Sequence, residues 1–201
     1  MIYADLHLHT TYSDDSSITP KILLEKLVNH SFIKVAAVTD HDTTKGVSTI
    51  CKLASACPDI LIIPGVEISA PQGDLLVLGT EETPPRPWTV GDVVDFAREN
   101  DYVSVVVHPY REYGMGDLAK NYRVDAIEVF NGASSSEANK KAQELMKLMG
   151  LPGVAGSDAH LPEELCTAYT EVDATMDVYE ILRAIKKGKV RASSVDKSIR
   201  F

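Results

Sequence analysis

The chain alternates short apolar runs with stretches in which apolar residues recur every three or four positions. Short runs bounded by turn residues are typical of buried strands, and the longer spacing is typical of helices with one face on a core. We expect strands at residues 2–8, 35–38, 60–63, 66–68, 75–78, 102–107, 126–130, 154–156 and 169–172. We expect helices at residues 20–28, 47–54, 90–97, 136–149 and 178–187, followed by a basic tail after Gly188.

Cap residues support the helix boundaries. Thr19 and Thr89 stand where an N-cap is expected, Pro20 stands at a first helical position, and Gly150 stands where the fourth helix ends. Strands and helices alternate about seven times without a long linker, which favours a parallel sheet covered by helices, either closed into a barrel or doubly wound. The length and the lack of an internal repeat fit one domain over residues 1–201.

Two histidines, His7 and His9, lie two positions apart near the start of the chain. Residues two apart on a strand project to the same face, so both imidazoles point one way. Imidazole is a common ligand for zinc and similar ions. Two half-buried strand histidines bonded to backbone would give the same pattern, so the pair needs support from the rest of the chain.

Further polar residues stand at or just after the ends of predicted strands. The full group includes five of the six histidines: His7, His9, Asp40, His41, Asp42, Glu67, His108, Asp158 and His160. The carboxyl ends of parallel strands meet at one side of a sheet or barrel, where sites are built. Separate cap and turn residues would have no reason to favour that end of every strand. So many ligands exceed one tetrahedral zinc site and suit two or three divalent ions that share carboxylates.

Five short motifs follow one another along the chain: His7-x-His9, Thr39-Asp40-His41-Asp42, Gly65-Val66-Glu67, His108-Pro109 and Ser157-Asp158-Ala159-His160. Together they resemble the motif set of the PHP (polymerase and histidinol phosphatase) superfamily. The resemblance implies an α/β fold, a distorted (β/α)7 TIM-like barrel with a dinuclear or trinuclear metal centre at the carboxyl ends of its strands. Members of the superfamily include phosphomonoesterases, phosphodiesterases and domains of bacterial replicative polymerases.

The resemblance also implies a ligand set. One ion would be held by His7, His9, Glu67 and Asp158, a second by Asp14, His41 and His160, and a third by His108 with Glu67 bridging. Asp15 is a rival to Asp14, because this chain has Ser13-Asp14-Asp15 where the family often has Ser-Asp-Gly. Asn131 stands where some members supply a further histidine, and its amide oxygen is a weaker ligand. We therefore expect two tightly bound zinc, manganese or iron ions and a labile or empty third site.

Such a centre predicts the chemistry. Two ions would lower the pKa of a bridging water and neutralise phosphoryl oxygens, so we expect a metal-bridging hydroxide to hydrolyse a phosphate ester of a small molecule or nucleotide. Arg111 and Lys45 lie on loops after strand ends and would bind a substrate phosphate, although such cations are often only solvent-exposed. Asp5 and Asp40 would orient ligand histidines, with the alternatives that Asp5 only begins the first strand and that Asp40 caps the following helix.

Three other functions stay open. A nuclease or oligonucleotide phosphodiesterase would use the same chemistry, but the chain lacks a basic groove with aromatic residues. An amidohydrolase-type C–N hydrolase shares the barrel and the His-x-His pair, yet ordinarily wants a lysine at a strand end, and none is found there. A non-catalytic metal-binding module is the third alternative, which the full ligand set disfavours.

Composition narrows the partners and the compartment. The net charge of −9 disfavours binding to nucleic acid or anionic membranes through charge alone, while bound cations would reverse the sign at one site. The three cysteines form no C-x-x-C pair and their number is odd, which favours a reducing cytoplasm. The start of the chain has no secretory signal pattern, and the apolar runs are too short to span a bilayer. We expect a small phosphorylated substrate, and the sequence makes no prediction of the oligomeric state.

Overall fold

The computed structural model describes residues 1–195 of the chain, so residues 196–201 of the expected domain lie outside it. The strands are β1 (Ile2–Asp5), β2 (Val35–Val38), β3 (Leu61–Ala70), β4 (Gly73–Leu78), β5 (Val103–Val106), β6 (Ala126–Asn131), β7 (Gly153–Gly156), β8 (Ala168–Val172) and β9 (Val190–Ser194). The helices are α1 (Pro20–Asn29), α2 (Lys45–Ala54), α3 (Val90–Glu99), α4 (Ser136–Met149) and α5 (Val178–Lys186), with a 3-10 helix η1 (Gly116–Asn121).

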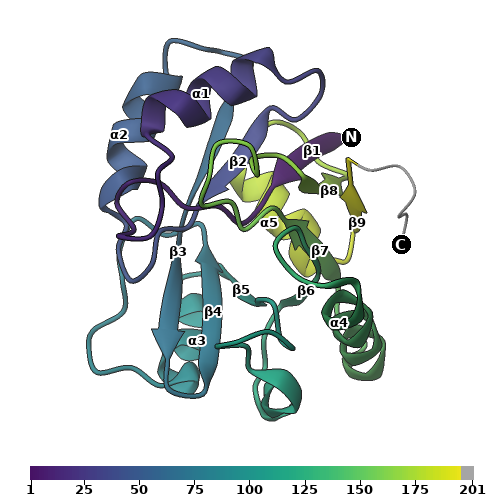
Figure 1. Cartoon of the computed structure of the whole chain (residues 1–201). Helices are drawn as coiled ribbons and strands as arrows, with labels where there is room; N and C mark the ends of the chain where they lie inside the picture. The colour runs from purple at the N-terminus through teal and green to yellow at the C-terminus, as the bar shows by residue number, and fades with distance from the viewer. Residues whose placement is uncertain (196–201) are drawn as a thin grey trace.

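The strands form one mixed sheet in the order β7-β6-β5-β4-β3-β2-β1-β8-β9 (Figure 1). Neighbours are parallel from β1 to β3 and from β5 to β7, whereas β4, β8 and β9 run antiparallel to their neighbours. The expected parallel pairing is therefore confirmed from β1 to β3 and from β5 to β7, and it is wrong for β4, β8 and β9. For β4 the physical reason is the turn at Pro71–Gln72, which is too short for a crossover and returns the chain as a hairpin.

The sheet curls until its two ends nearly meet. Strands β7 and β9 lie side by side, and the segment after β1 pairs in parallel with the segment after β7 through Leu8 and Ala159. Two backbone hydrogen bonds hold this closure, from His9 N to Ala159 O at 3.0 Å and from Asp158 N to His7 O at 2.7 Å. The closure joins the first and last of the motifs found in the sequence.

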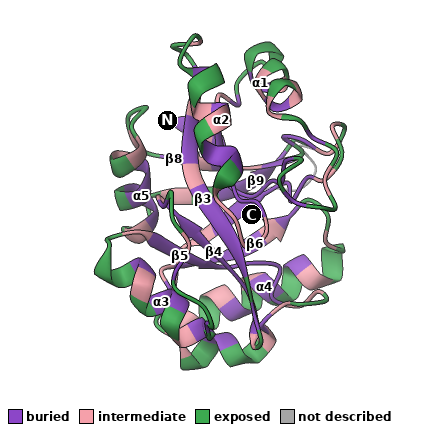
Figure 2. Ribbon diagram, turned by 90° about the vertical axis from the view of Figure 1, so that its left-hand side faces the viewer, coloured by how far each residue is buried: buried purple, intermediate pink, exposed green. Residues whose placement is uncertain are grey.

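The core is divided between the inside and the outside of the barrel. Inside, Ile181, Leu182 and Ile185 of α5 pack with buried residues near the amino ends of several strands, among them Ile2, Val35 and Val103. Helix α5 therefore covers one end of the barrel and leaves the carboxyl ends of the parallel strands open. The other four helices pack on the outside, α1 and α2 against each other and α4 against β6. Figure 2 shows the buried strands between helices whose outer faces are exposed.

Most expected elements are confirmed, with local differences. The side chains of Thr19 and Thr89 cap α1 and α3 as expected, and Gly150 ends α4 in the left-handed conformation. The two strands expected on either side of Gly65 are one continuous β3, and the expected basic tail contains β9. No helix in residues 1–195 is long and apolar enough to cross a membrane.

Candidate metal centre

Four buried side chains converge at the open end of the barrel. His7 and His9 follow β1, Glu67 lies on β3, and Asp158 follows β7. The Nε2 atoms of the two histidines are 3.2 Å apart, and each lies 3.1 Å from Oε2 of Glu67. Oδ1 of Asp158 lies 3.2 Å from Nε2 of His9. Two imidazole nitrogens and two carboxylate oxygens thus face one point, a donor set that fits a divalent ion.

The charges of this group show what it needs. Burial alone would lower the pKa of His9, but hydrogen bonds to Asp158 and Glu67 outweigh burial and raise it to about 9. Burial alone would raise the pKa of Glu67, but the positive charge of His7 and hydrogen bonds from the histidines hold it well below its usual range. Two buried carboxylates require a cation between them, and a divalent ion supplies that charge while the imidazoles stay neutral.

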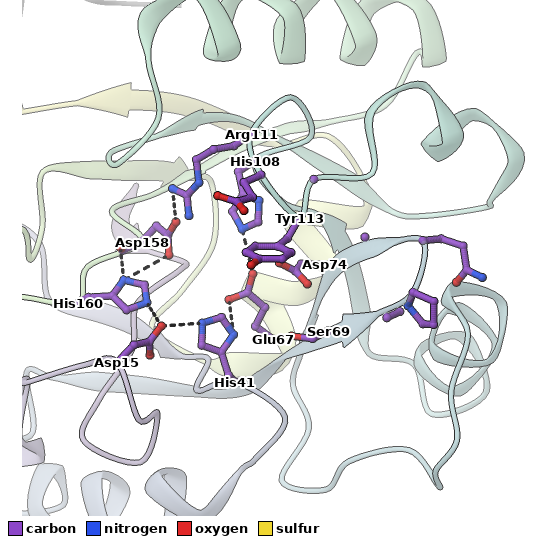
Figure 3. Close-up of a pocket in the computed structure, with 16 residues that line it drawn as sticks. Asp15, His41, Glu67, Ser69, Asp74, His108, Arg111, Tyr113, Asp158 and His160 are labelled. Carbon is purple, nitrogen blue, oxygen red and sulfur yellow. Dashed lines mark hydrogen bonds and ion pairs between the residues drawn. The ribbon is translucent and has the colours of Figure 1, made fainter.

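A second group lies on the more exposed side of the first. Nε2 of His41 and Nε2 of His160 lie 3.5 and 3.3 Å from Oδ2 of Asp15 (Figure 3). Both rings stack on the ring of His9, with centroids 4.3 and 4.2 Å away. Asp14, the first candidate for this position, is exposed and does not line the cavity. The carboxylate beside the two histidines is therefore that of Asp15.

A third group contains a residue that the sequence reasoning missed. Nε2 of His108 lies 3.0 Å from Oε1 of Glu67, and Asp74 of β4 brings its carboxylate to the same place. Nδ1 of His108 is buried without a hydrogen-bond partner in the described residues, as expected for a ring whose surroundings are incomplete without a ligand. Burial, with the nearby charge of Glu67, raises the pKa of Asp74 to about 7.

Asn131, considered above for a third ion, has its amide occupied by hydrogen bonds. Its Oδ1 accepts from the backbone N–H of Ala133 at 3.0 Å and from Arg111 at 3.3 Å. Its Nδ2 donates to Glu128 at 2.9 Å and to Asp158 at 3.1 Å. The structure thus gives Asn131 a role in orienting carboxylates and places Asp74 beside the third group instead.

Glu128 is the second residue that the sequence reasoning missed. It lies on β6, where Oε1 is 3.0 Å from Nδ1 of His7 and Oε2 accepts the backbone N–H of His108 at 2.9 Å. A carboxylate on the far nitrogen of a ligand histidine fixes its tautomer and raises its basicity. A single acidic residue inside an apolar strand was the signal available in the sequence.

Asp5 and Asp40, expected to orient histidines, act through the backbone and through Ser13. Asp5 accepts hydrogen bonds from N and Oγ of Ser157 at 2.8 and 2.6 Å, which fixes the segment that carries Asp158. Asp40 accepts from Oγ of Ser13 at 3.1 Å, and that hydroxyl lies 3.4 Å from Nδ1 of His9. Within residues 1–195 the structure records no direct bond from either carboxylate to an imidazole.

Members of all three groups line one open cavity of about 690 Å³, in which the first group is represented by Glu67 and Asp158. Arg111 also lines it, and its Nη1 lies 2.7 Å from Oδ2 of Asp158 (Figure 3). Lys45, the other cation considered for substrate phosphate, is exposed at the start of α2 and does not line the cavity. The cavity thus combines a cluster suited to cations with one arginine.

Comparison with known proteins gives several likenesses. A family described as PHP-associated matches residues 136–190. An uncharacterized protein of Methanocaldococcus jannaschii is 32% identical over 82% of this chain and 68% of its own length. A second uncharacterized protein of that organism is 29% identical over 64% of this chain and 81% of its own length.

Solved structures share the fold at low identity. A two-domain protein from Bacteroides vulgatus, described as containing a predicted PHP-like metal-dependent phosphoesterase, has a TM-score of 0.80 and 18% identity over 96% of this chain. The chain spans 64% of that protein's length. An amidohydrolase from Chromobacterium violaceum has a TM-score of 0.65 and 20% identity, covering 81% of this chain and 89% of that one. A candidate metal-dependent phosphoesterase from Bifidobacterium adolescentis has a TM-score of 0.64 and 15% identity, covering 78% and 87%.

Proposed function

This chain belongs to the PHP superfamily, and we propose that it is a metal-dependent phosphoesterase acting on a phosphate ester of a small molecule or nucleotide. The centre would hold two or three divalent ions, and these would be zinc, manganese or iron. His7, His9, Glu67 and Asp158 would hold the first ion. Asp15, His41 and His160 would hold the second, and Glu67, Asp74 and His108 the third.

The position of Glu67 carries this proposal. Its Oε2 lies 3.1 Å from His7 and from His9 and 3.3 Å from His41, whereas its Oε1 lies 3.0 Å from His108. One buried carboxylate therefore faces all three groups. A carboxylate in this position would help to hold adjacent ions, and such ions would supply the charge stabilisation that phosphoryl transfer uses.

When bound, such ions would lower the pKa of a water molecule at the site and neutralise the charge that develops on the phosphoryl oxygens. Arg111 would bind the phosphate. Both of its recorded contacts, with Asp158 and Asn131, use Nη1, so within the described residues Nη2 and Nε are left to donate to a phosphoryl oxygen. Glu128 would hold His7 with its Nε2 toward the ion site, and Asn131 would hold Asp158 in the same way.

The charge of the cavity lining favours a small substrate over a nucleic acid. Arg111 is the one cationic side chain among the described residues that line the cavity, apart from its histidines. A protein that binds a nucleic-acid strand requires a row of basic residues that follows the phosphate backbone of that strand. No lysine lines the cavity in residues 1–195, so the amidohydrolase alternative lacks the lysine expected of it.

The experiment compares three substrates with and without metal. The protein is purified with Mn²⁺, Zn²⁺ or Fe²⁺ and assayed on a phosphate monoester, a phosphate diester and an amide. We expect hydrolysis of a phosphate ester that is lost in His9→Ala and kept in His30→Ala, a control histidine at the end of α1. Hydrolysis of the amide alone would favour a C–N hydrolase. Bound metal without hydrolysis of any substrate would favour a metal-binding module.

A further inference from the structure

We infer that Tyr113 is a specificity-determining residue, whose ring stacks on a flat aromatic group in the alcohol part of the substrate. The inference rests on the proposed function and narrows it to phosphate esters of alcohols that carry an aromatic ring. It is drawn from the exposure of Tyr113, the rigidity of its loop, its place beside the third ligand group and the lack of charge on the neighbouring wall.

Tyr113 is an aromatic side chain left uncovered at a cavity. It is 73% exposed, the largest exposed fraction among the large hydrophobic side chains of residues 1–195. Most exposed hydrophobic residues are scattered over a protein surface without a function. Tyr113 differs because it lines the same cavity as the candidate metal ligands, and Figure 3 draws it together with Asp74 and His108 among the residues of that cavity.

The loop that carries Tyr113 is held in one position. The carbonyl oxygen of Tyr113 accepts a hydrogen bond from the backbone N–H of Asp74 at 2.9 Å, which ties the loop to the β3–β4 hairpin. On both sides the packing admits only glycine: a Cβ on Gly73 would lie 2.7 Å from the backbone of Met115, and one on Gly114 would lie 2.3 Å from the carbonyl oxygen of His108.

Tyr113 itself has a φ of +63°, a left-handed conformation that is unfavourable for an aromatic residue. Surrounding structure must impose such a conformation, and residues of this kind gather at functional sites. An aromatic ring presented by a rigid backbone loses little conformational entropy when it stacks on a ligand. The loop therefore offers Tyr113 as a preformed surface.

The place of the ring relative to the candidate ions suits the alcohol part of an ester. Asp74 connects Tyr113 to the third ligand group. Its backbone N–H donates a hydrogen bond to the carbonyl oxygen of Tyr113, and its carboxylate lies with Glu67 and His108. A phosphate at the ligand groups would thus bring the alcohol part toward Tyr113.

The neighbouring wall of the cavity is the hairpin segment 69–73, with the sequence Ser-Ala-Pro-Gln-Gly, which carries no charge. A second phosphate or a carboxylate on the alcohol part would find no cation on this wall. A neutral, flat ring fits both the wall and Tyr113.

The test uses two esters that differ only in aromaticity. Benzyl phosphate and cyclohexylmethyl phosphate release alcohols of similar acidity, so any difference between them reports binding of the ring. We expect Tyr113→Ala to raise KM for benzyl phosphate roughly fivefold to tenfold, in the upper part of the range of about twofold to twelvefold that the loss of an aromatic pair predicts. KM for cyclohexylmethyl phosphate and kcat for both esters should change by less than about twofold. Tyr113→Phe and Tyr113→Trp should keep the preference, because each keeps a ring.

Tyr179→Ala is the matched control, since Tyr179 is an exposed tyrosine on α5, away from the cavity. Equal effects of Tyr113→Ala on both esters, or no preference in the wild type, would overturn the inference. If the wild type hydrolyses neither ester, the kinetic comparison has no readout, and the proposed function is judged by its own experiment on the three substrate classes. The inference is then tested by calorimetric binding of benzylphosphonate and cyclohexylmethylphosphonate to the metal-loaded protein. Equal affinity for the two phosphonates, in the wild type and in Tyr113→Ala, would reject it.

Discussion

Oε1 of Glu128 lies 3.0 Å from Nδ1 of His7, while Nε2 of the same ring lies 3.1 Å from Glu67. Both nitrogens of the imidazole are therefore fixed, Nδ1 by Glu128 of β6 and Nε2 beside Glu67 at the candidate ion position. This arrangement makes Glu128 a positioning residue for His7.

Replacing Glu128 with glutamine should weaken metal binding without unfolding the protein. The amide keeps the size of the side chain but removes the charge that makes His7 a better donor. We expect the affinity for the first ion to fall about tenfold to 100-fold, measured by competition with a chromogenic chelator. Glu171→Gln serves as the control, because Glu171 pairs with Arg191 on β9, away from the cavity. Equal affinity in the wild type and in Glu128→Gln would contradict this role.

Asp15 and Asp14 form a matched pair for the second ion. The carboxylate of Asp15 lies near His41 and His160, and that of Asp14 is exposed away from the cavity. We expect Asp15→Asn to remove about one ion per chain and Asp14→Asn to leave the metal content unchanged. Elemental analysis of both variants after dialysis measures the difference. The reverse result would return the ligand role to Asp14.

Replacing Asp74 with asparagine should abolish binding of a third ion and leave binding of the other two ions unchanged. Because Asp74 contacts the group that contains His108 and not the one that contains His41, its loss should affect one site only. We expect the weakest of the binding steps to vanish from a calorimetric titration with Mn²⁺ while the tighter steps persist. A titration with the same number of steps in wild type and variant would show that Asp74 holds no ion.

His30 gives a pH-dependent contribution to stability that is independent of the metal centre. Its Nδ1 accepts the backbone N–H of Ile33 at 2.9 Å, which requires the unprotonated nitrogen. Partial burial, then the charges of Lys26 and Lys34, lower the pKa of His30 below its ordinary value in the folded state. The unfolded chain therefore takes up the proton first, and stability falls as the pH drops below about 6.5.

The variant His30→Ala isolates this effect. At pH 7.5 the wild type should be more stable by about 0.5–1.5 kcal/mol, the usual contribution of a hydrogen bond. The difference should shrink at pH 5.5, where His30 in the unfolded chain is protonated. Urea denaturation of both proteins at the two pH values measures it, and protonation of the metal ligands cancels because both proteins share them. A difference that stays constant between the two pH values would refute the mechanism.

The sequence was informative where chemistry coincides with a strand end. His7, His41 and Asp158 could be placed near one another because each follows an apolar run, and strand ends of that kind share one side of a barrel. Asp74 and Glu128 could not be placed, because they lie within strands and the period of a short apolar run does not tell which face is inside. The choice between Asp14 and Asp15 depended on the path of a loop, which spacing along the chain does not determine.

The direction of the strands was the main error in the fold. Only a short segment separates the expected strands at 66–68 and 75–78, and in the structure it forms a hairpin in which β4 runs antiparallel to β3. That hairpin brings Asp74 to Glu67. A parallel pair of strands at this place would require a long crossover that separates Asp74 from Glu67, so the expected strand direction also hid this candidate ligand.

The parallel pairing of Leu8 with Ala159 has a consequence for the order of events during synthesis. The first candidate ion draws three of its four ligands from the segments that this pairing joins, His7 and His9 from one and Asp158 from the other. A nascent chain that stops short of Asp158 holds His7, His9 and Glu67 without the fourth ligand. We therefore expect metal to bind late, after the segment that carries Asp158 has been synthesised and has closed the barrel. The bound ion should then link the parts of the polypeptide that are made first and last.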